Sequence, residues 1–336
     1  MRKVGKNSLE FNKVFLKSSA VSAGPKEESS PLKDYLDYCF CDLHCDGVTW
    51  EDSEINLLRK AFLMALEKGA LDVSDISMVF GGDLNNQIVV SSYLMNEFDI
   101  PFIGIYGACS TSVLGLINGS VFIDGGFNNY IACMSSSHNS TSERQFRYPT
   151  EYGVQRSPAV TSTVTGAGVG IISNIPSKIK ITKATIGKVC DAGLKDASDM
   201  GRTMAPAAAF TLIQHFKDFD IDENDYDLII TGDLSFYGSK VFIDILKEYG
   251  INLGNKYNDA GLMIYDINRQ DVLAGGSGCA CVSLVMYGYL CELLKLKKLK
   301  KVLVIATGAL LNPVMTFQGK NIPAIAHAIS LEAYDD

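Results

Sequence analysis

The sequence predicts an α/β protein built from two duplicated halves, because apolar strand-like runs alternate with helical patterns and three segments of the first half recur in the second. The repeats keep their order: residues 75–84 recur at 227–234, the turn at Gly107 recurs within 275–285, and residues 129–138 recur within 301–312. A repeat of about half the chain length indicates one supersecondary unit used twice. We therefore expect parallel sheets with right-handed crossovers and helices on both faces.

Composition predicts a soluble, mildly acidic intracellular protein. The chain has 336 residues and a formal net charge of −8, from Lys+Arg 30 against Asp+Glu 38. We expect no nucleic-acid partner, because the one basic run, 295–301, is interpreted as the solvated end of a helix with at most a weak attraction to membrane surfaces. Nine cysteines without a secreted-domain framework indicate a reducing compartment. We expect no signal peptide and no transmembrane segment; the longest apolar run, 283–294, is too short and contains Glu292.

The first elements are predicted to be an edge strand, a cysteine-rich loop and a helix. The edge strand covers 14–16, and a polar connector follows to residue 32. The helix covers 50–69, with Ser53 as its cap and Gly69 as its stop. The loop between them holds residues of the types that bind zinc, namely Cys39, Cys41, His44 and Cys45. Four ligands within seven residues would strain a tetrahedral site, so we interpret this segment as a packed loop and keep zinc as the alternative.

The following segment predicts a ligand-binding edge of the sheet. A strand over 75–82 ends in the polar run DLNNQ at 83–87. In open α/β sheets, ligands bind at the carboxyl ends of the strands. A helix over about 88–97 then leads to a buried, central strand at 101–106.

Cys109 stands at the turn between this strand and a helix that is apolar nearly all round. Ser110 lies at the helix start, and Gly125 and Gly126 end the helix. Unpaired N–H groups and the positive end of the helix dipole favour a thiolate at such a position. The turn therefore predicts an activated nucleophile or an anion-binding pocket, with an inert buried cysteine as the alternative.

A long polar loop is predicted after a strand at 130–134. It carries Ser136, His138, Arg144 and Arg147. Long loops in compact domains are usually functional, so we expect this one to contribute to a site. A glycine-interrupted strand or hairpin at 162–172 follows, in which backbones approach closely.

Several longer runs, spread through nearly the whole chain, carry a family resemblance. They are AGPKE at 23–27, GDLNNQ at 82–87, YGACSTS at 106–112, ERQFRYPTEYG at 143–153, TSTVTGAG at 161–168, MAPAAA at 204–209, YDLIITGDLS at 226–235, AGGSGCAC at 274–281 and ATGALL at 306–311. With these runs the sequence resembles the stage V sporulation protein AD family of the thiolase superfamily. The resemblance implies a five-layered αβαβα fold with halves at 1–176 and 177–336, and a homodimer.

The same resemblance implies a function in spores. The family binds dipicolinic acid (pyridine-2,6-dicarboxylate), and Ca²⁺ is expected as part of the ligand complex. It helps to move this compound into the forespore and out at germination, beside membrane-embedded proteins of the same transport system. We therefore expect peripheral association with the forespore or spore inner membrane and no cofactor.

An enzymatic function is not expected, because the residues that assist the cysteine in condensing enzymes are missing. Where the resemblance would place their histidine and asparagine, this chain has Gly232 and the turn 276–278. The alternative is an acyl-CoA condensing enzyme or thioesterase that uses Cys109 with a displaced histidine, either His327 or His138.

The candidate ligand-binding residues come from the turns of both halves and from the polar loop. They are Asp83, Cys109, Ser110, Ser136, His138, Arg144, Arg147, Asp233 and Ser277. Arginines suit the two carboxylates of the ligand, and Asp83 and Asp233 could meet its calcium ion. The alternatives are that the arginines bridge subunits and that the aspartates cap helices or fix turns.

Overall fold

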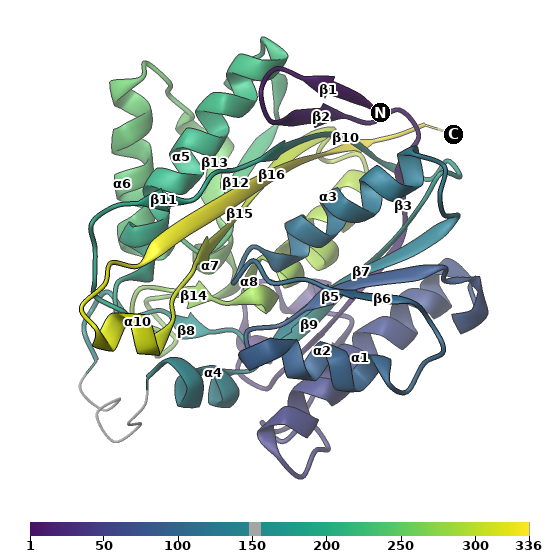
Figure 1. Cartoon of the computed structure of the whole chain (residues 1–336), viewed down its shortest axis with the longest axis horizontal. Helices are drawn as coiled ribbons and strands as arrows, with labels where there is room; N and C mark the ends of the chain where they lie inside the picture. Colours follow the sequence, from purple (N-terminus) through teal and green to yellow (C-terminus); the bar gives the residue numbers. More distant parts are fainter. Residues whose placement is uncertain (148–155, 336) are drawn as a thin grey trace.

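The fold, seen in a computed structural model that describes residues 1–147 and 156–335, is a stack of helical and sheet layers (Figure 1). The strands of the first half lie in the order β3, β9, β7, β5, β6. Their bounds are Phe15–Ala23, Gly166–Ser173, Tyr130–Ser137, Met78–Gly82 and Phe102–Gly104. The strands of the second half lie in the order β10, β16, β15, β12, β13. Their bounds are Ile179–Ile186, Pro323–Ala333, Lys301–Ala309, Leu228–Thr231 and Tyr257–Asp259.

Both halves use the same strand order and the same directions. β5 pairs in parallel with β6 and β7, and β12 pairs in parallel with β13 and β15. β9 and β16 each run antiparallel to their two neighbours. The α/β fold predicted from the sequence is confirmed, but the expectation of purely parallel sheets is wrong because one long antiparallel strand is inserted in each half.

Helices form three layers around the sheets. α1 (Trp50–Gly69) and α2 (Val89–Met95) cover the outer face of the first half, and α5 (Met200–Phe219) and α6 (Ser235–Glu248) cover that of the second. Between the sheets lies α3 (Thr111–Asp124), beside the continuous helical segment of α8, η8 and α9 (Figure 1). The last three cover Cys279–Ser283, the π-helical Leu284–Leu290, and Cys291–Lys295. The helix after Cys109 is therefore buried, as its apolar sequence predicted.

Shorter elements complete the chain. The strands are β1 (Arg2–Val4), β2 (Ser8–Glu10), β4 (Tyr38–Cys39), β8 (Ser162–Thr163), β11 (Cys190–Asp191) and β14 (Gly276–Ser277). The helices are α4 (Asn139–Phe146), α7 (Ala260–Ile264) and α10 (Pro313–Phe317). Among the described residues, no helix is both long enough and apolar enough to cross a membrane.

Three local predictions are corrected. The first long strand, β3, is not an edge strand but lies in the middle of the strand order and is almost wholly buried. The strand before Cys109, β6, is the edge strand of its half, with Ile103 and Gly104 exposed. The cap of α1 is Thr49, which forms a capping box with Asp52. Short apolar runs do not tell a central strand from an edge strand, because that choice depends on tertiary pairing.

The polar segment after Met134 is also not a loop where the structure describes it. β7 continues to Ser137, and α4 follows directly, capped by His138. The later part of the predicted loop, 148–155, lies outside the described residues. The serines of the strand face a buried polar network, which an apolar-strand pattern does not reveal.

A close backbone approach joins the two halves at the turn before Cys109, and it gives a stability prediction. A Cβ atom on Gly308 of β15 would lie 2.4 Å from the carbonyl oxygen of Gly107. We expect Gly308→Ala to lower the free energy of unfolding by about 1–3 kcal/mol, because backbone must move to relieve the clash. Thermal and urea unfolding measure this loss. Gly115→Ala, in the interior of α3 with its nearest neighbour at 3.4 Å, is the control. An equal loss in both variants would contradict the prediction.

Candidate functional site

Three turns from both halves converge on Cys109. The first, 107–110, precedes α3; the second, 232–235, follows β12; and the third, 276–278, leads into α8. The Cys109 thiol lies beside the Asp233 carboxyl group, which accepts the N–H of Gly278 at 3.2 Å. The predicted meeting of the two duplicated turns therefore occurs around a thiol and a carboxyl group.

The Asp233 carboxyl group is held in place from several sides. Thr307 on β15 donates its hydroxyl to Asp233 Oδ1 at 2.5 Å, and the N–H of Asp233 donates to the same hydroxyl at 3.1 Å. Burial raises the pKa of Asp233 to about 7, against the opposing effect of its hydrogen bonds to Thr307 and Cys109. Asp233 therefore changes charge near neutral pH. The sequence pointed to Asp233 through the repeat but gave no sign of Thr307.

The Cys109 thiol is not activated. Burial raises its pKa well above the usual value, and the neighbouring Asp233 adds to the shift. This direction favours the inert buried cysteine that the sequence left open as the alternative, because loss of solvation and a nearby carboxyl group outweigh the positive end of α3. The Ser110 hydroxyl donates to the carbonyl oxygen of Gly107 at 2.6 Å and so holds the turn together.

A second thiol lies beside the first. Cys279, at the start of α8, is fully buried, and its thiol lies 3.0 Å from the carbonyl oxygen of Ala108. Leu84 packs with Cys109 and Cys279, and Phe146 at the end of α4 covers this group. The sequence repeat aligned the two turns but did not indicate that their cysteines touch.

A pocket of about 410 Å³ opens on the outer side of Phe146. Its walls combine five side-chain amides with apolar groups and Tyr106. The lining includes Asn85, Asn86, Gln87, Ile88, Tyr106, Gln145, Phe146, Leu311 and Asn312. The polar run after the second predicted strand thus lies on the wall of a pocket. In the described part of the chain, the side-chain NH₂ groups of Asn86 and Asn312 have no protein partner.

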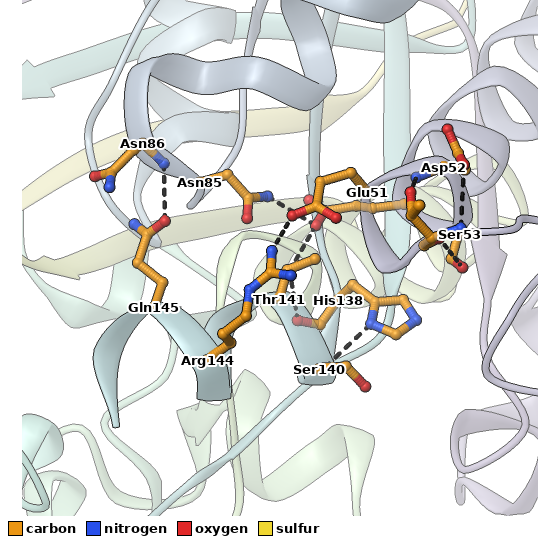
Figure 2. Close-up of polar contacts among 12 residues, drawn as sticks. Glu51, Asp52, Ser53, Asn85, Asn86, His138, Ser140, Thr141, Arg144 and Gln145 are labelled. Atoms are coloured by element: carbon orange, nitrogen blue, oxygen red, sulfur yellow. Dashed lines mark hydrogen bonds and ion pairs between the residues drawn. The ribbon is translucent and has the colours of Figure 1, made fainter. Parts of the chain in front are cut away.

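The pocket wall includes two residues with left-handed backbone conformations, and Ala108 in the turn before Cys109 has the same conformation. Gln87 and Ile88 have φ values of 60° and 50°, and Ala108 has a φ of 49°. A β-branched residue in the left-handed region is uncommon, and such residues gather at functional sites. Gln145 braces this wall (Figure 2): it accepts the N–H of Asn86 at 2.9 Å and donates to the carbonyl oxygen of Leu84 at 2.7 Å.

Glu54 of α1 organises a buried network next to the pocket, and the sequence analysis missed it. Its carboxyl group accepts hydrogen bonds from Ser136, Asn85 and Thr141, at 2.9, 3.0 and 2.9 Å. Burial raises the pKa of Glu54 to about 8, and Asp83 adds to the shift. The available signal was spacing, since Glu54 lies on the same helical face as the buried residues three, four and seven positions later.

Asp83 and Ser136 are therefore committed to internal contacts. Asp83 accepts the N–H of Asn85 at 3.0 Å and both the N–H and the hydroxyl of Ser91 at 2.8 Å. Ser277 is likewise bonded to Thr161, hydroxyl to hydroxyl, at 2.8 Å. These contacts fit the alternative reading of the aspartates as residues that fix turns. Their direct contact with a ligand stays a prediction.

Neither candidate histidine reaches Cys109. The Nδ1 atom of His138 accepts the N–H of Ser140 at 3.1 Å (Figure 2), and its Nε2 atom lies 2.7 Å from the carbonyl oxygen of Leu43. His327 on β16 accepts the N–H of Gly187 at 3.3 Å. Burial lowers the pKa of both rings, that of His327 to about 4. Both rings are bonded to other groups, so neither is in place to take a proton from Cys109 as the displaced-base alternative requires.

The two candidate arginines lie in different surroundings. Arg144 is half exposed and forms an ion pair with Glu51 of α1 (Figure 2). Arg147 has only 15% of its side chain exposed, pairs with Glu143, and donates to the carbonyl oxygen of Thr161 at 2.9 Å. Because Thr161 also contacts Ser277, Arg147 is linked to the turn of the second half, whereas Arg144 is not.

The structure does not bring metal-binding side chains together at the zinc or calcium positions that the sequence suggested. The described residues contain no group of three or more His, Cys, Asp or Glu side chains that could hold a metal ion. Of the cysteine-rich loop, Cys41 is exposed, and His44 stacks on Trp50 at 4.4 Å between ring centroids. The zinc alternative has no support there. A calcium ion at this site would have to bring most of its ligands with it.

Comparison with known proteins decides the family. A family model described as stage V sporulation protein AD (SpoVAD) matches residues 5–332. The chain is 47% identical over 333 residues to stage V sporulation protein AD of Bacillus subtilis (strain 168), covering 99% of this chain and 98% of that protein. The chain belongs to the stage V sporulation protein AD family. The resemblance stated from the sequence is thereby confirmed.

Solved structures agree with a thiolase-like fold for this family member. A crystal structure of OleA from Xanthomonas campestris matches with a TM-score of 0.61 at 14% identity, covering 96% of this chain and 99% of that one. A cerulenin-bound OleA structure matches with a TM-score of 0.60 at 14% identity, covering 96% and 98%. At this identity the likeness shows the fold alone.

The titration of Glu54 gives a pH prediction. The folded protein holds this proton up to a pKa of about 8, whereas the unfolded chain releases it near the ordinary value of 4.5. The folded state binds more protons in this window, so its free energy of unfolding falls as pH rises. We expect Glu54→Gln to lose less melting temperature than wild type between pH of about 5.5 and 8.5. The exposed Glu67→Gln on the same helix is the control, and equal pH slopes in wild type and Glu54→Gln would contradict the assignment.

The raised pKa of the Cys109 thiol predicts low reactivity. Iodoacetamide at neutral pH should modify Cys109 at least about tenfold more slowly than the exposed Cys41, because the thiolate is the nucleophile. Asp233→Asn should speed modification of Cys109, since it removes the carboxyl group that opposes the thiolate. Peptide mass spectrometry over a time course measures both rates. Faster modification of Cys109 than of Cys41 in wild type would contradict the prediction.

Proposed function

We propose that this family member binds dipicolinate without catalysing a reaction, as a component of the sporulation machinery that moves dipicolinate into the forespore and out at germination. Family membership supports the sporulation role. The observation that carries the non-catalytic part is that Cys109 is buried with its pKa raised well above the usual value, while His138 and His327 are bonded to other groups. A protonated thiol is a poor nucleophile toward a thioester, because the thiolate is the reactive form.

The pocket over Phe146 is the proposed ligand site. Dipicolinate is a flat aromatic ring with two carboxylates, so it needs apolar contact on its faces and hydrogen-bond donors at its edge. Phe146 and Tyr106 offer aromatic surface, and Asn86 and Asn312 offer amide donors. Arg147, directly after Phe146, is held by Glu143 and Thr161 beside this pocket, and we expect it to exchange Glu143 for a ligand carboxylate. A calcium ion bound to dipicolinate would share the remaining carboxylate oxygens.

The proposed assembly is a homodimer beside membrane-embedded transport proteins, at the forespore or spore inner membrane. The edge strand β6 supports a dimer, because its outer backbone groups lack a neighbouring strand among the described residues. Ile103 on β6 and Tyr93 on α2 expose 36% and 68% of their surface nearby. A second copy of the chain could cover this edge.

Isothermal titration with dipicolinate, with and without Ca²⁺, tests the binding proposal. Arg147→Gln should weaken binding by about tenfold or more, because a charge-assisted hydrogen bond to a carboxylate is lost. Arg144→Gln is the matched control and should change the dissociation constant by less than about twofold, since Arg144 is half exposed and is not linked to the turn of the second half.

Two further measurements separate the proposal from its alternative. Isophthalate, which lacks the ring nitrogen, should bind more weakly than dipicolinate when Ca²⁺ is present. Absence of saturable dipicolinate binding up to millimolar ligand would overturn the binding function. Incubation with acetyl-CoA followed by mass spectrometry should leave Cys109 unmodified; an acyl adduct on Cys109 would instead favour a condensing enzyme or thioesterase.

A further inference from the structure

Three loops at one end of the molecule carry large, exposed apolar side chains. Phe127 follows α3 and exposes 76% of its surface, Ile175 lies between β9 and β10 and exposes 47%, and Leu296 follows α9 and exposes 60%. Scattered single apolar residues are normal on a protein surface. Three of them on separate loops at one end call for an explanation by a shared partner.

Strand register places these loops at the same end of the sheets. Tyr130, which follows the Phe127 loop, is paired with Ser173, which precedes the Ile175 loop. Ser173 and Lys180 are both paired with Phe15, and Lys180 and Lys301 are both paired with Glu332. These paired residues form one row across the strands of both halves, and the row lies at the amino ends of β7 and β15.

Direct contacts tie the chain termini into the same end. The N–H groups of Tyr334 and Ala333 donate to the carbonyl oxygens of Lys178 and Lys300, each at 2.8 Å. Asp124 at the end of α3 pairs with the N-terminal amine and accepts the N–H of Lys13 at 2.7 Å. Both termini and the end of α3 lie together in Figure 1. We call residues 12–17, 124–129, 174–180, 295–301 and 332–335 the lysine end.

The lysine end is basic in a protein whose net charge is −8. Its lysines are Lys13, Lys17, Lys178, Lys180, Lys295, Lys297, Lys298, Lys300 and Lys301. Its acidic residues within the described chain are Asp124, Glu332 and Asp335, and each is bonded to a lysine or to the N-terminal amine. The acidic segment 222–227 adjoins it, and the Asp227 carboxylate accepts the backbone N–H groups of Lys300 and Lys301 at 2.6 and 2.9 Å.

We propose that the lysine end docks on the surface of an anionic lipid bilayer. The lysines would meet the head groups, each contributing roughly 1 kcal/mol close to the surface. Phe127, Ile175 and Leu296 would enter the boundary between head groups and acyl chains. A fluid surface can receive three separate apolar tips at once, whereas an acidic protein would need a matching depression for each. This proposal says how the protein would associate with the membrane, which is part of the proposed function, but it does not depend on dipicolinate binding.

Sedimentation with vesicles tests the proposal on the full chain. Vesicles of phosphatidylcholine alone are compared with vesicles containing about one third phosphatidylglycerol, at about 50 mM and about 500 mM salt. We expect binding to the anionic vesicles at low salt, with loss at high salt. Lys178, Lys298 and Lys300 are exposed and form no ion pair in the described structure, so their joint replacement by Glu should weaken binding at least about tenfold. Phe127→Ser combined with Leu296→Ser should also weaken it.

Matched variants elsewhere on the surface provide the controls. Lys217, Lys240 and Lys247, on α5 and α6, are exposed lysines to be replaced by Glu in the same number. Val314→Ser with Phe317→Ser on α10 removes exposed apolar surface away from the lysine end. Both should bind vesicles as wild type does, and thermal unfolding verifies that all variants are folded.

The outcomes separate the two proposals. Equal binding to neutral and anionic vesicles, or an equal loss in the control variants, would overturn the lipid assignment. No binding to anionic vesicles would also overturn it and would point to an acidic protein surface as the partner of the lysine end. Titration with dipicolinate is unaffected in either case, because the pocket lies at the other end of the strands.

Discussion

The buried group of Cys109, Asp233 and Thr307 joins turns of the two halves, and the hydrogen bonds of Asp233 to Thr307 and Gly278 hold it together. Each residue comes from a different turn or strand, and all three are buried between α3 and α8. Unpaired polar groups in such a place would each cost about 1–3 kcal/mol, so the turns are fixed relative to one another. Phe146 packs on this buried group, so the fixed turns also hold the wall of the pocket that Phe146 forms.

The same contact sets the chemistry. A thiolate is stabilised by a nearby cation, and here the neighbouring Asp233 carboxyl group and a second thiol instead raise the pKa of Cys109. The family member thus keeps the thiolase-like fold seen in OleA while its central turn favours a neutral thiol. A fold that supports catalysis in one protein can support binding in another, because function depends on the groups placed at the site.

The site and the lysine end lie at opposite ends of the parallel strands. The pocket is lined by residues that follow the carboxyl end of β5, and the lysine end surrounds the amino ends of β7 and β15. A chain resting on a bilayer through its lysines would hold its pocket open away from the lipid. Beside the pocket, the polar atoms of Glu54 and His138 are satisfied within the protein.

The sequence by itself determined the family, the duplication, the buried helix after Cys109 and the polar run at the pocket, because these follow from local patterns and from repetition along the chain. Only the tertiary structure decided that β6 is an edge strand, that α4 replaces a loop, and that Glu54 and Thr307 belong to the site. It also showed that His138 and His327 are neutral and bonded to groups other than Cys109. The physical reason is that pairing, burial and pKa depend on neighbours far apart in sequence, such as Asp233 and Thr307, whose hydrogen bond no local pattern reveals.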